Sequence, residues 1–364
     1  MTVEVEFGPP FQSLPSPVVE LASGVDALYL TGRAALPASL LNPLDEARSE
    51  AVLFRQAVPL VLGGEEFQVA WHGFNKYHFS LEHPYARIGF TESSFLPAIY
   101  VQPRTEFLQG YGPRSAVQWV RDVLESECGP VLFGVHRLDL FGDFQGWDLS
   151  GEARDEFVCR AKSRHLYEDD GVFNGLIFGQ RKTGTVLARI YDKTIQSAKT
   201  GSGYWPMIWG ERFDPERSVI RVEFEIGRNG LRDYRVSDPE DVLAVTGALW
   251  QSLTHGWLTH RVPTKDQTRS RWTASPTWEA VQRARVGMSD FGINRMYLGK
   301  RRGGAANLMP MLEGYLASFG AYAEASTFED MLPDLREFLA QRERDTGVAL
   351  SERIAERRRR FGLP

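Results

Sequence analysis

The stretch GLIFGQRKTGTVLARIYDK, residues 175–193, has the pattern of a β-hairpin. Two apolar runs flank a short polar turn, KTG at 182–184, which ends in glycine. Because alternate residues of a strand share a face, Arg189, Tyr191 and Lys193 are expected on one face of the second strand. The hairpin therefore presents a tyrosine between two cations.

Acidic strands are predicted on both sides of this hairpin in the sequence. The run RLDLFGD (137–143) precedes it, and the run VIRVEFEI (219–226) follows it. Alternation gives each run one charged face, made of Arg137, Asp139 and Asp143 in the first and of Arg221, Glu223 and Glu225 in the second. Carboxylates that point from apolar strands favour a shared hard cation, Mg²⁺ or Mn²⁺. The alternative is a network in which Arg137 and Arg221 balance the acids.

The remaining pattern predicts an α+β fold. Short β-like runs span residues 58–62, 67–72, 77–81, 86–90 and 99–107, and Pro59 restricts the first to a sheet edge. A helix over 113–127 leads into a strand over 131–144, which is a βαβ signal. Further helices are predicted over 148–166, 237–260, 277–286, 308–325, 328–345 and 351–361. We expect an antiparallel-rich sheet or sheets with βαβ units and helices on one face, followed by a small, mostly helical C-terminal region.

Length and charge suggest how the 364 residues are divided. We expect an extended, proline-rich N-terminal segment (1–50), the N-terminal part of the α+β domain (51–130), its catalytic part (131–260) and a basic C-terminal region (261–364). The net charge is −5, but residues 261–310 carry an excess of about seven positive charges. Such a local excess can hold a polyanion. The residues of this region that we expect to contact such a polyanion are Arg269, Arg271, Lys300, Arg301 and Arg302.

Several classes of protein are excluded by what the sequence lacks. There is no apolar run long enough to span a membrane and no secretion signal at the N-terminus. Two cysteines, Cys128 and Cys159, are too few for a disulfide framework or a zinc cage. We therefore expect a cytoplasmic protein without a membrane partner. No P-loop is present, so we do not expect the chain to be an ATP-driven helicase; a homodimer is compatible with the sequence.

The order of the three motifs, with GRNGLRDY (227–234) after the third, resembles the replication initiation factors of rolling-circle plasmids and phages, the Rep_trans type, and related relaxases. The resemblance covers about residues 67–285. It implies an enzyme that nicks one DNA strand at an origin. Tyr191 would attack a phosphodiester, stay joined to the 5′ phosphate and leave a 3′ hydroxyl for a host polymerase. A host helicase would be a further partner.

The resemblance also implies roles for the other charged residues. Asp139 and Glu223 would be the first metal ligands, with Asp143 and Glu225 as second candidates. Lys193 and Arg189 would hold the phosphate or stabilise the phenolate, and Arg137 and Arg221 would orient carboxylates or contact DNA. Tyr234 is the reserve nucleophile. The broader group of nickases carries a histidine pair on a central strand, where this chain has acids.

The expected substrate is single-stranded or cruciform origin DNA, because a tyrosine at a strand end cannot reach an in-line geometry inside an intact duplex. Candidates for base stacking are Trp205, Trp209 and Trp272. Three other functions stay open: a catalytically silent origin-binding protein, a conjugative relaxase of an integrative element, and a metal-dependent hydrolase without a covalent intermediate.

Overall fold

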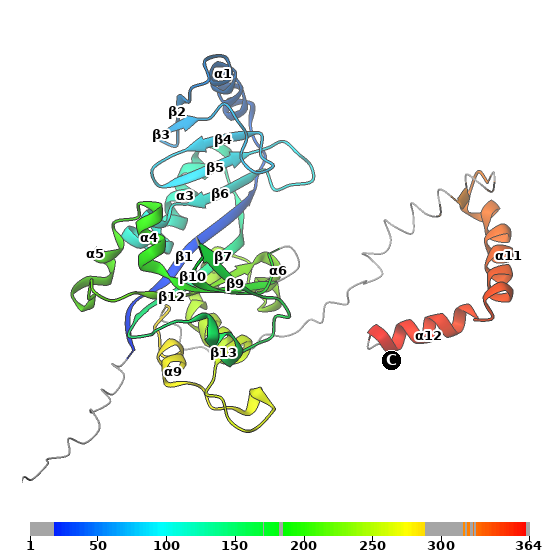
Figure 1. Cartoon of the computed structure of the whole chain (residues 1–364). Coiled ribbons are helices and arrows are strands. Elements are labelled where there is room, and N and C mark those ends of the chain that lie inside the picture. Colours follow the sequence, from blue (N-terminus) through cyan, green and yellow to red (C-terminus); the bar gives the residue numbers. More distant parts are fainter. Residues whose placement is uncertain are drawn as a thin grey trace, which may run out of the picture. The chain divides into compact units, whose positions relative to one another are not determined.

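One large antiparallel sheet of eleven strands dominates the computed structural model (Figure 1). The structure describes residues 18–169, 171–181, 185–287 and 325–361, together with residues 316, 319, 320 and 323. In pairing order the strands are β2 (Val58–Leu62), β3 (Glu65–Val69), β4 (Phe79–Glu82), β5 (Ala86–Phe90), β6 (Ile99–Pro103), β1 (Val19–Arg33), β7 (Leu132–Gln145), β12 (Ile220–Gly227), β11 (Val186–Asp192), β10 (Val172–Phe178) and β9 (Arg164–Asp169). Together with its helices, this sheet confirms the predicted α+β class.

Helices and short helical turns connect the strands. They are α1 (Ala38–Phe54), α2 (Thr105–Tyr111), α3 (Pro113–Cys128), η1 (Gly151–Glu156), α4 (Lys193–Thr200), α5 (Trp205–Trp209), η2 (Gly210–Arg212), α6 (Arg228–Asp233), α7 (Pro239–Ala244), α8 (Thr246–Ser252), η3 (Leu253–Trp257), η4 (Arg269–Arg271), α9 (Pro276–Gln282), α11 (Phe328–Thr346) and α12 (Leu350–Phe361). Two short strands, β8 (Phe157–Cys159) and β13 (Leu258–His260), form a separate pair.

The longest strand, β1, lies in the middle of the large sheet, between β6 and β7. It comes from the segment for which the prolines predict a loose extension, so that expectation is wrong for residues 19–50, which form β1 and most of α1. Alternation explains the strand, because Leu28 and Leu30 are fully buried while Tyr29 between them faces the other side of the sheet. Residues 1–17 lie outside the described part.

The predicted βαβ unit is present, but another strand, β1, lies between its two parallel strands. Both β6 and β7 run antiparallel to β1, which lies between them, so they are parallel to each other and are connected through α2 and α3. The strand with Pro59 is an edge strand, as predicted. The predicted helix over 148–166 is wrong, since η1, β8 and the start of β9 occupy it, and the helix over 237–260 is broken into α7, α8 and η3 before β13.

The two faces of the sheet differ. One packs against α1, α3, α7, α8 and α9 in a continuous apolar core that contains the fully buried Trp250 and Trp278. The other carries the charged residues of the motifs, and α4 and α5 lie over part of it, where Trp205 packs on Phe141. The apolar face stabilises the sheet and leaves the polar face for a site.

The chain divides into two compact units, residues 1–295 and 296–364. The division does not fall near Arg261, where the composition changes. The backbone N–H of Arg261 donates to the carbonyl of Glu156 at 3.0 Å, and α9 packs into the core of the first unit. The predicted helices over 328–345 and 351–361 correspond to α11 and α12. Most of the helix predicted over 308–325 lies outside the described residues.

Candidate functional site

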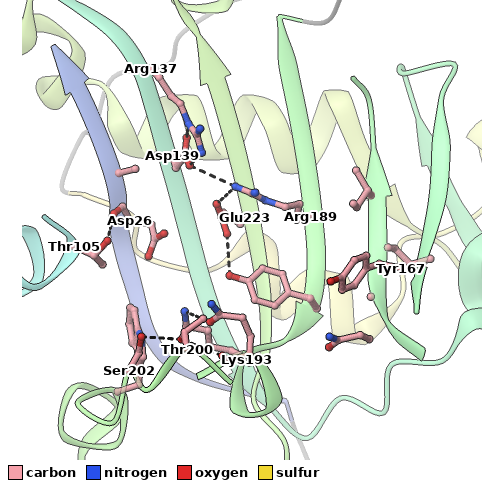
Figure 2. Close-up of a pocket in the computed structure, with 18 of the residues that line it drawn as sticks. Asp26, Thr105, Arg137, Asp139, Tyr167, Arg189, Lys193, Thr200, Ser202 and Glu223 are labelled. Atoms are coloured by element: carbon pink, nitrogen blue, oxygen red, sulfur yellow. Dashed lines mark hydrogen bonds and ion pairs between the residues drawn. The ribbon is translucent and has the colours of Figure 1, made fainter. Parts of the chain in front are cut away.

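Three neighbouring strands place the predicted motifs side by side (Figure 2). Tyr191 of β11 is opposite Arg221 of β12 in the strand register, and Arg189 is opposite Glu223. On the other side of β12, Glu225 is opposite Asp139 of β7. Tyr191, Glu223 and Asp139 line one cavity of about 560 Å³. The turn at 182–184 lies outside the described residues, but β10 and β11 pair as the predicted hairpin.

A hydrogen bond joins the tyrosine to an acid. The hydroxyl of Tyr191 donates to Oε2 of Glu223 at 3.0 Å. Burial raises the pKa of Tyr191 well above its ordinary value, and the charge of Glu223 adds to this. Burial also acts to raise the pKa of Glu223, but Arg189 and Arg221 outweigh it and hold that pKa below its ordinary value. At neutral pH the pair is thus a phenol bonded to a carboxylate, which is poised to accept the phenol proton.

Ion pairs link the acids of this face to two arginines. Arg137 donates to both oxygens of Asp139, through Nε at 2.7 Å and through Nη2, which also lies 3.0 Å from Glu225. Arg189 pairs with Glu223 and has its Nη2 3.5 Å from Asp139. The network of ion pairs that the sequence analysis gave as the alternative to a shared cation is therefore present. Burial still raises the pKa of Asp139 to about 7, although Arg137 opposes the shift.

A buried group of three charges supports the network from β1. The register of β1 on β7 shifts between Val25 and Ala27, so Asp26 is the extra residue of a β-bulge. Its carboxylate accepts from Nη1 of Arg221 at 2.7 Å, and Nε and Nη2 of Arg221 donate to Asp143 at 2.7 and 2.8 Å. Sequence reasoning missed Asp26, because a bulge has no sequence signature.

This burial corrects two predictions. Neither Arg221 nor Asp143 has exposed surface, so Arg221 has none for the predicted DNA contact and only orients carboxylates. Asp143 does not line the cavity that holds Asp139 and Glu223, and its oxygens are hydrogen-bonded to Arg221 and to Nε1 of Trp209, so it is not available as a metal ligand there. Trp205 and Trp209 are also buried and cannot stack on bases.

Lys193 begins α4 at the edge of the cavity and is 5% exposed. Its Nζ donates to Oε1 of Gln196 at 2.7 Å and lies 4.6 Å from the ring centre of Trp205. Burial lowers the pKa of Lys193 to about 8. The charged groups that face it are Arg221, which lowers the pKa further, and Asp26, Asp143 and Glu223, which raise it. An amine with this pKa can hold and release a proton near neutral pH.

The chemistry of the cavity suits a divalent cation. Its lining includes four carboxylates, on Asp26, Glu106, Asp139 and Glu223, against three cations, on Arg137, Arg189 and Lys193. Oxygen donors are those that Mg²⁺ and Mn²⁺ prefer, and the excess of acids leaves room for added positive charge. Within the described ranges, no three His, Cys, Asp or Glu side chains form a ready-made ligand group.

Other predicted residues lie away from this cavity. Tyr234 is buried, with its hydroxyl 3.1 Å from Oγ of Ser252, so the reserve nucleophile is wrongly predicted. The exposed Arg269 and Arg271 pair with Asp155 and Asp266, and DNA contact by them stays a prediction. Glu225 is 11% exposed and pairs with Arg137. Lys300, Arg301 and Arg302 fall outside the described residues.

Comparisons with known proteins give a similarity in structure but none in sequence. No protein-family model matches the sequence, and neither does any curated protein. Among the described helices, none is long and apolar enough to cross a membrane. A solved structure, the rolling circle replication initiator protein from Geobacillus stearothermophilus, aligns with 73% of this chain and 98% of its own length, at 17% identity and a TM-score of 0.41. We base the function on the side chains of the site and not on this similarity.

Proposed function

We propose that this chain cuts one strand of DNA by transesterification, with Tyr191 as the nucleophile, as an initiator of rolling-circle replication. The observation that carries the proposal is the hydrogen bond from the Tyr191 hydroxyl to Glu223, inside a cavity lined by Arg189 and Lys193. A phenol is a weak nucleophile at neutral pH and needs a base beside it. The order of the sequence motifs supports the same chemistry.

The proton of the nucleophile has a direct path. As the Oη of Tyr191 forms its bond to phosphorus, the phenol proton moves to Oε2 of Glu223, which is 3.0 Å away. Glu223 is ionised in the resting site because Arg189 and Arg221 lower its pKa. The phenol is therefore deprotonated only as the bond forms. This avoids a free phenolate, which burial disfavours.

The leaving oxygen takes its proton from Lys193. The bond between phosphorus and the 3′ oxygen breaks, and the amine of Lys193, with a pKa of about 8, protonates that oxygen. The products are a 5′ phosphate ester on Tyr191 and a free 3′ hydroxyl. The reverse sequence of proton transfers reseals the strand, so joining requires no nucleotide. Arg189 lines the cavity with an unpaired buried Nε, a donor that an oxygen of a bound phosphate can satisfy.

A divalent cation, Mg²⁺ or Mn²⁺, belongs to the proposal because the carboxylates of the cavity outnumber its cations. Asp139 and Glu223 would hold it. When bound, it neutralises charge on the phosphate. The residues of the chain then align the phosphodiester with the Oη of Tyr191.

The test uses a pool of single-stranded DNA with a randomised segment, because the cut sequence is unknown. Incubation with the protein and Mn²⁺ should yield a protein–DNA adduct that survives denaturing electrophoresis. A 3′ label should stay with the protein and a 5′ label should be released. The Tyr191→Phe variant should form no adduct. Binding without cutting would favour the silent binding protein, and cutting without an adduct would favour the hydrolase; either result would refute the proposal. A conjugative relaxase would share the adduct.

A further inference from the structure

We call the cavity that Tyr191, Glu223 and Asp139 line the catalytic cavity. Two further cavities lie at the end of the sheet where β1 ends and β7 begins. One, of about 540 Å³, is lined by Arg33, Arg228, Arg232 and Arg235, and the other, of about 610 Å³, shares Arg33 and Arg228 with it. We call these two adjoining cavities the arginine groove. It lies outside the catalytic cavity, and none of its four arginines lines that cavity.

The charges of the arginine groove are not balanced. Within the described part of the chain, no carboxylate forms an ion pair with any of the four arginines, in contrast to the arginines of the catalytic cavity. Two acids line the groove, Glu92 and Asp238, and the carboxylate of Asp238 accepts from the backbone N–H of Glu240, where it caps α7. A surface with four cations and two acids attracts an anion.

The arginines are also close enough to repel one another. Burial lowers the pKa of Arg228, and the neighbouring charges of Arg232 and Arg33 lower it further. A guanidinium loses protons only far above neutral pH, so all of these groups stay charged. Like charges held together are unfavourable in the free protein, and an anion placed among them relieves the repulsion.

Apolar and hydroxyl groups lie beside the cations. Phe95 lines the larger cavity with its side chain 94% exposed, and Thr91 and Ser93 lie in the same cavity. Leu132 in the smaller cavity is 70% exposed. Exposed aromatic rings next to arginines form the kind of surface on which nucleic-acid bases stack while phosphates pair with the cations. An inorganic anion cannot stack on the ring of Phe95, whereas a base can.

The arginine groove is linked to the catalytic cavity along β7. Gly134 lines the groove and Asp139 lines the catalytic cavity, and these two positions, five residues apart, are separated by about 16 Å of strand. The register of β7 on β1 shifts here: Arg137 pairs with Tyr29, and Val135 pairs with Leu30, so His136 is the extra residue of a bulge. Arg137, which lines the catalytic cavity, lies between Gly134 and Asp139 on this strand.

We propose that the arginine groove binds the sugar–phosphate backbone of single-stranded DNA that flanks the cleaved bond, with Phe95 stacking on a base. The inference rests on the proposed function in one respect, that the ligand is DNA. It assigns residues outside the catalytic cavity to substrate binding, and it predicts that their loss weakens binding without altering the chemistry at Tyr191.

The test measures binding of a fluorescent 25-nucleotide single strand of mixed sequence across a range of salt concentrations. The Tyr191→Phe chain is used, so that cutting does not interfere. Each phosphate neutralised on a single strand contributes about 0.7 to the slope of log affinity against log salt. The double variant Arg33→Gln/Arg232→Gln should therefore lower that slope by about 1.4 and weaken binding at 0.1 M salt by about tenfold. Both side chains are exposed, so folding should be retained.

Three matched variants separate the contributions. The pair Arg33→Lys/Arg232→Lys keeps the charge and should keep the slope, and Arg55→Gln removes an exposed arginine from outside the groove and should change nothing. Phe95→Ser should weaken binding at every salt concentration with an unchanged slope, because stacking is not ionic. If the double glutamine variant binds with the slope of its parent, the inference is wrong, whatever the fate of Tyr191. If the groove variants behave as expected but Tyr191 forms no adduct, only the proposed function fails.

Discussion

Replacing Arg221 by glutamine should destabilise the first unit of the chain strongly. The guanidinium has no exposed surface and donates to Asp143 at 2.7 and 2.8 Å and to Asp26 at 2.7 Å. It also packs against two aromatic rings, 4.1 Å from the ring centre of Phe141 and 4.0 Å from that of Trp205. Glutamine has no charge and too few donors to replace these contacts.

The expected loss follows from the charges left behind. Among the residues that the structure describes, Asp143 without Arg221 keeps only the indole N–H of Trp209, and Asp26 keeps no cation within hydrogen-bond distance. Removing one partner of a buried ion pair typically costs about 3–5 kcal/mol of folding free energy. Replacing both partners with apolar residues, Arg221→Met with Asp143→Leu, should cost less than Arg221→Gln alone, because no charge stays unpaired at Asp143.

Urea unfolding followed by tryptophan fluorescence measures this loss. All nine tryptophans precede residue 296, so the signal reports on the first unit. The midpoint should fall by roughly 1–2 M for Arg221→Gln, given a urea slope of about 3 kcal/mol/M for a unit of this size. The exposed Arg217→Gln serves as the matched control and should shift the midpoint little. A loss below about 1 kcal/mol for Arg221→Gln would refute the account of a buried charge group.

The remaining predictions concern the reaction. Glu223→Gln removes the base and one carboxylate that would hold the cation, so it should slow adduct formation by at least about 10²–10⁴-fold. It leaves Arg189 and Lys193 in the cavity, so the affinity for single-stranded DNA should be retained; equal loss of both would contradict that role. Lys193 must be charged to act as the acid, so the rate should decline as the pH rises through about 8, and the Lys193→Met variant should lack this decline when its rate is measured over the same range. EDTA should abolish adduct formation, and Mn²⁺ should restore it. The thermal unfolding midpoint should be the same with and without EDTA, because arginines already pair with Asp139 and Glu223. A midpoint lowered by several degrees in EDTA would show that the ion is part of the folded site. A Cβ at Gly175 would lie 2.5 Å from the carbonyl oxygen of Ile190 and 2.8 Å from the Cβ of Tyr191. Gly175→Ala should therefore displace the tyrosine and lower the rate of adduct formation tenfold or more. An unchanged rate would show that the strand accommodates the methyl group.

Strand alternation was sufficient to predict which charged residues share a face. Arg189 and Tyr191 face the same way because they are two residues apart, and the same parity groups Arg221 with Glu223. Regular antiparallel strands preserve that parity across β7, β12 and β11, so the main residues of the catalytic cavity could be named from the sequence.

Two kinds of feature could not be predicted. One interrupts the alternation of side chains along a strand, and the other depends on packing between segments that are far apart in the sequence. Asp26 reaches Arg221 because a bulge inserts one residue into β1, and no pattern in a strand's sequence marks that insertion. The burial of Arg221 requires Trp205, which α5 carries over the polar face of the sheet. The arginine groove joins the ends of β1 and α6, which are far apart in sequence.

The most direct test of the central claim is to locate the DNA on the protein. After reaction with single-stranded DNA, digestion with nuclease and trypsin should leave a nucleotide on one peptide, which mass spectrometry identifies. Cleavage after Arg189 and Lys193 gives the peptide of residues 190–193, and the account predicts the nucleotide on Tyr191 within it. A nucleotide on any other residue, such as Tyr167 of the same cavity, or DNA cut with no modified peptide, would contradict the account.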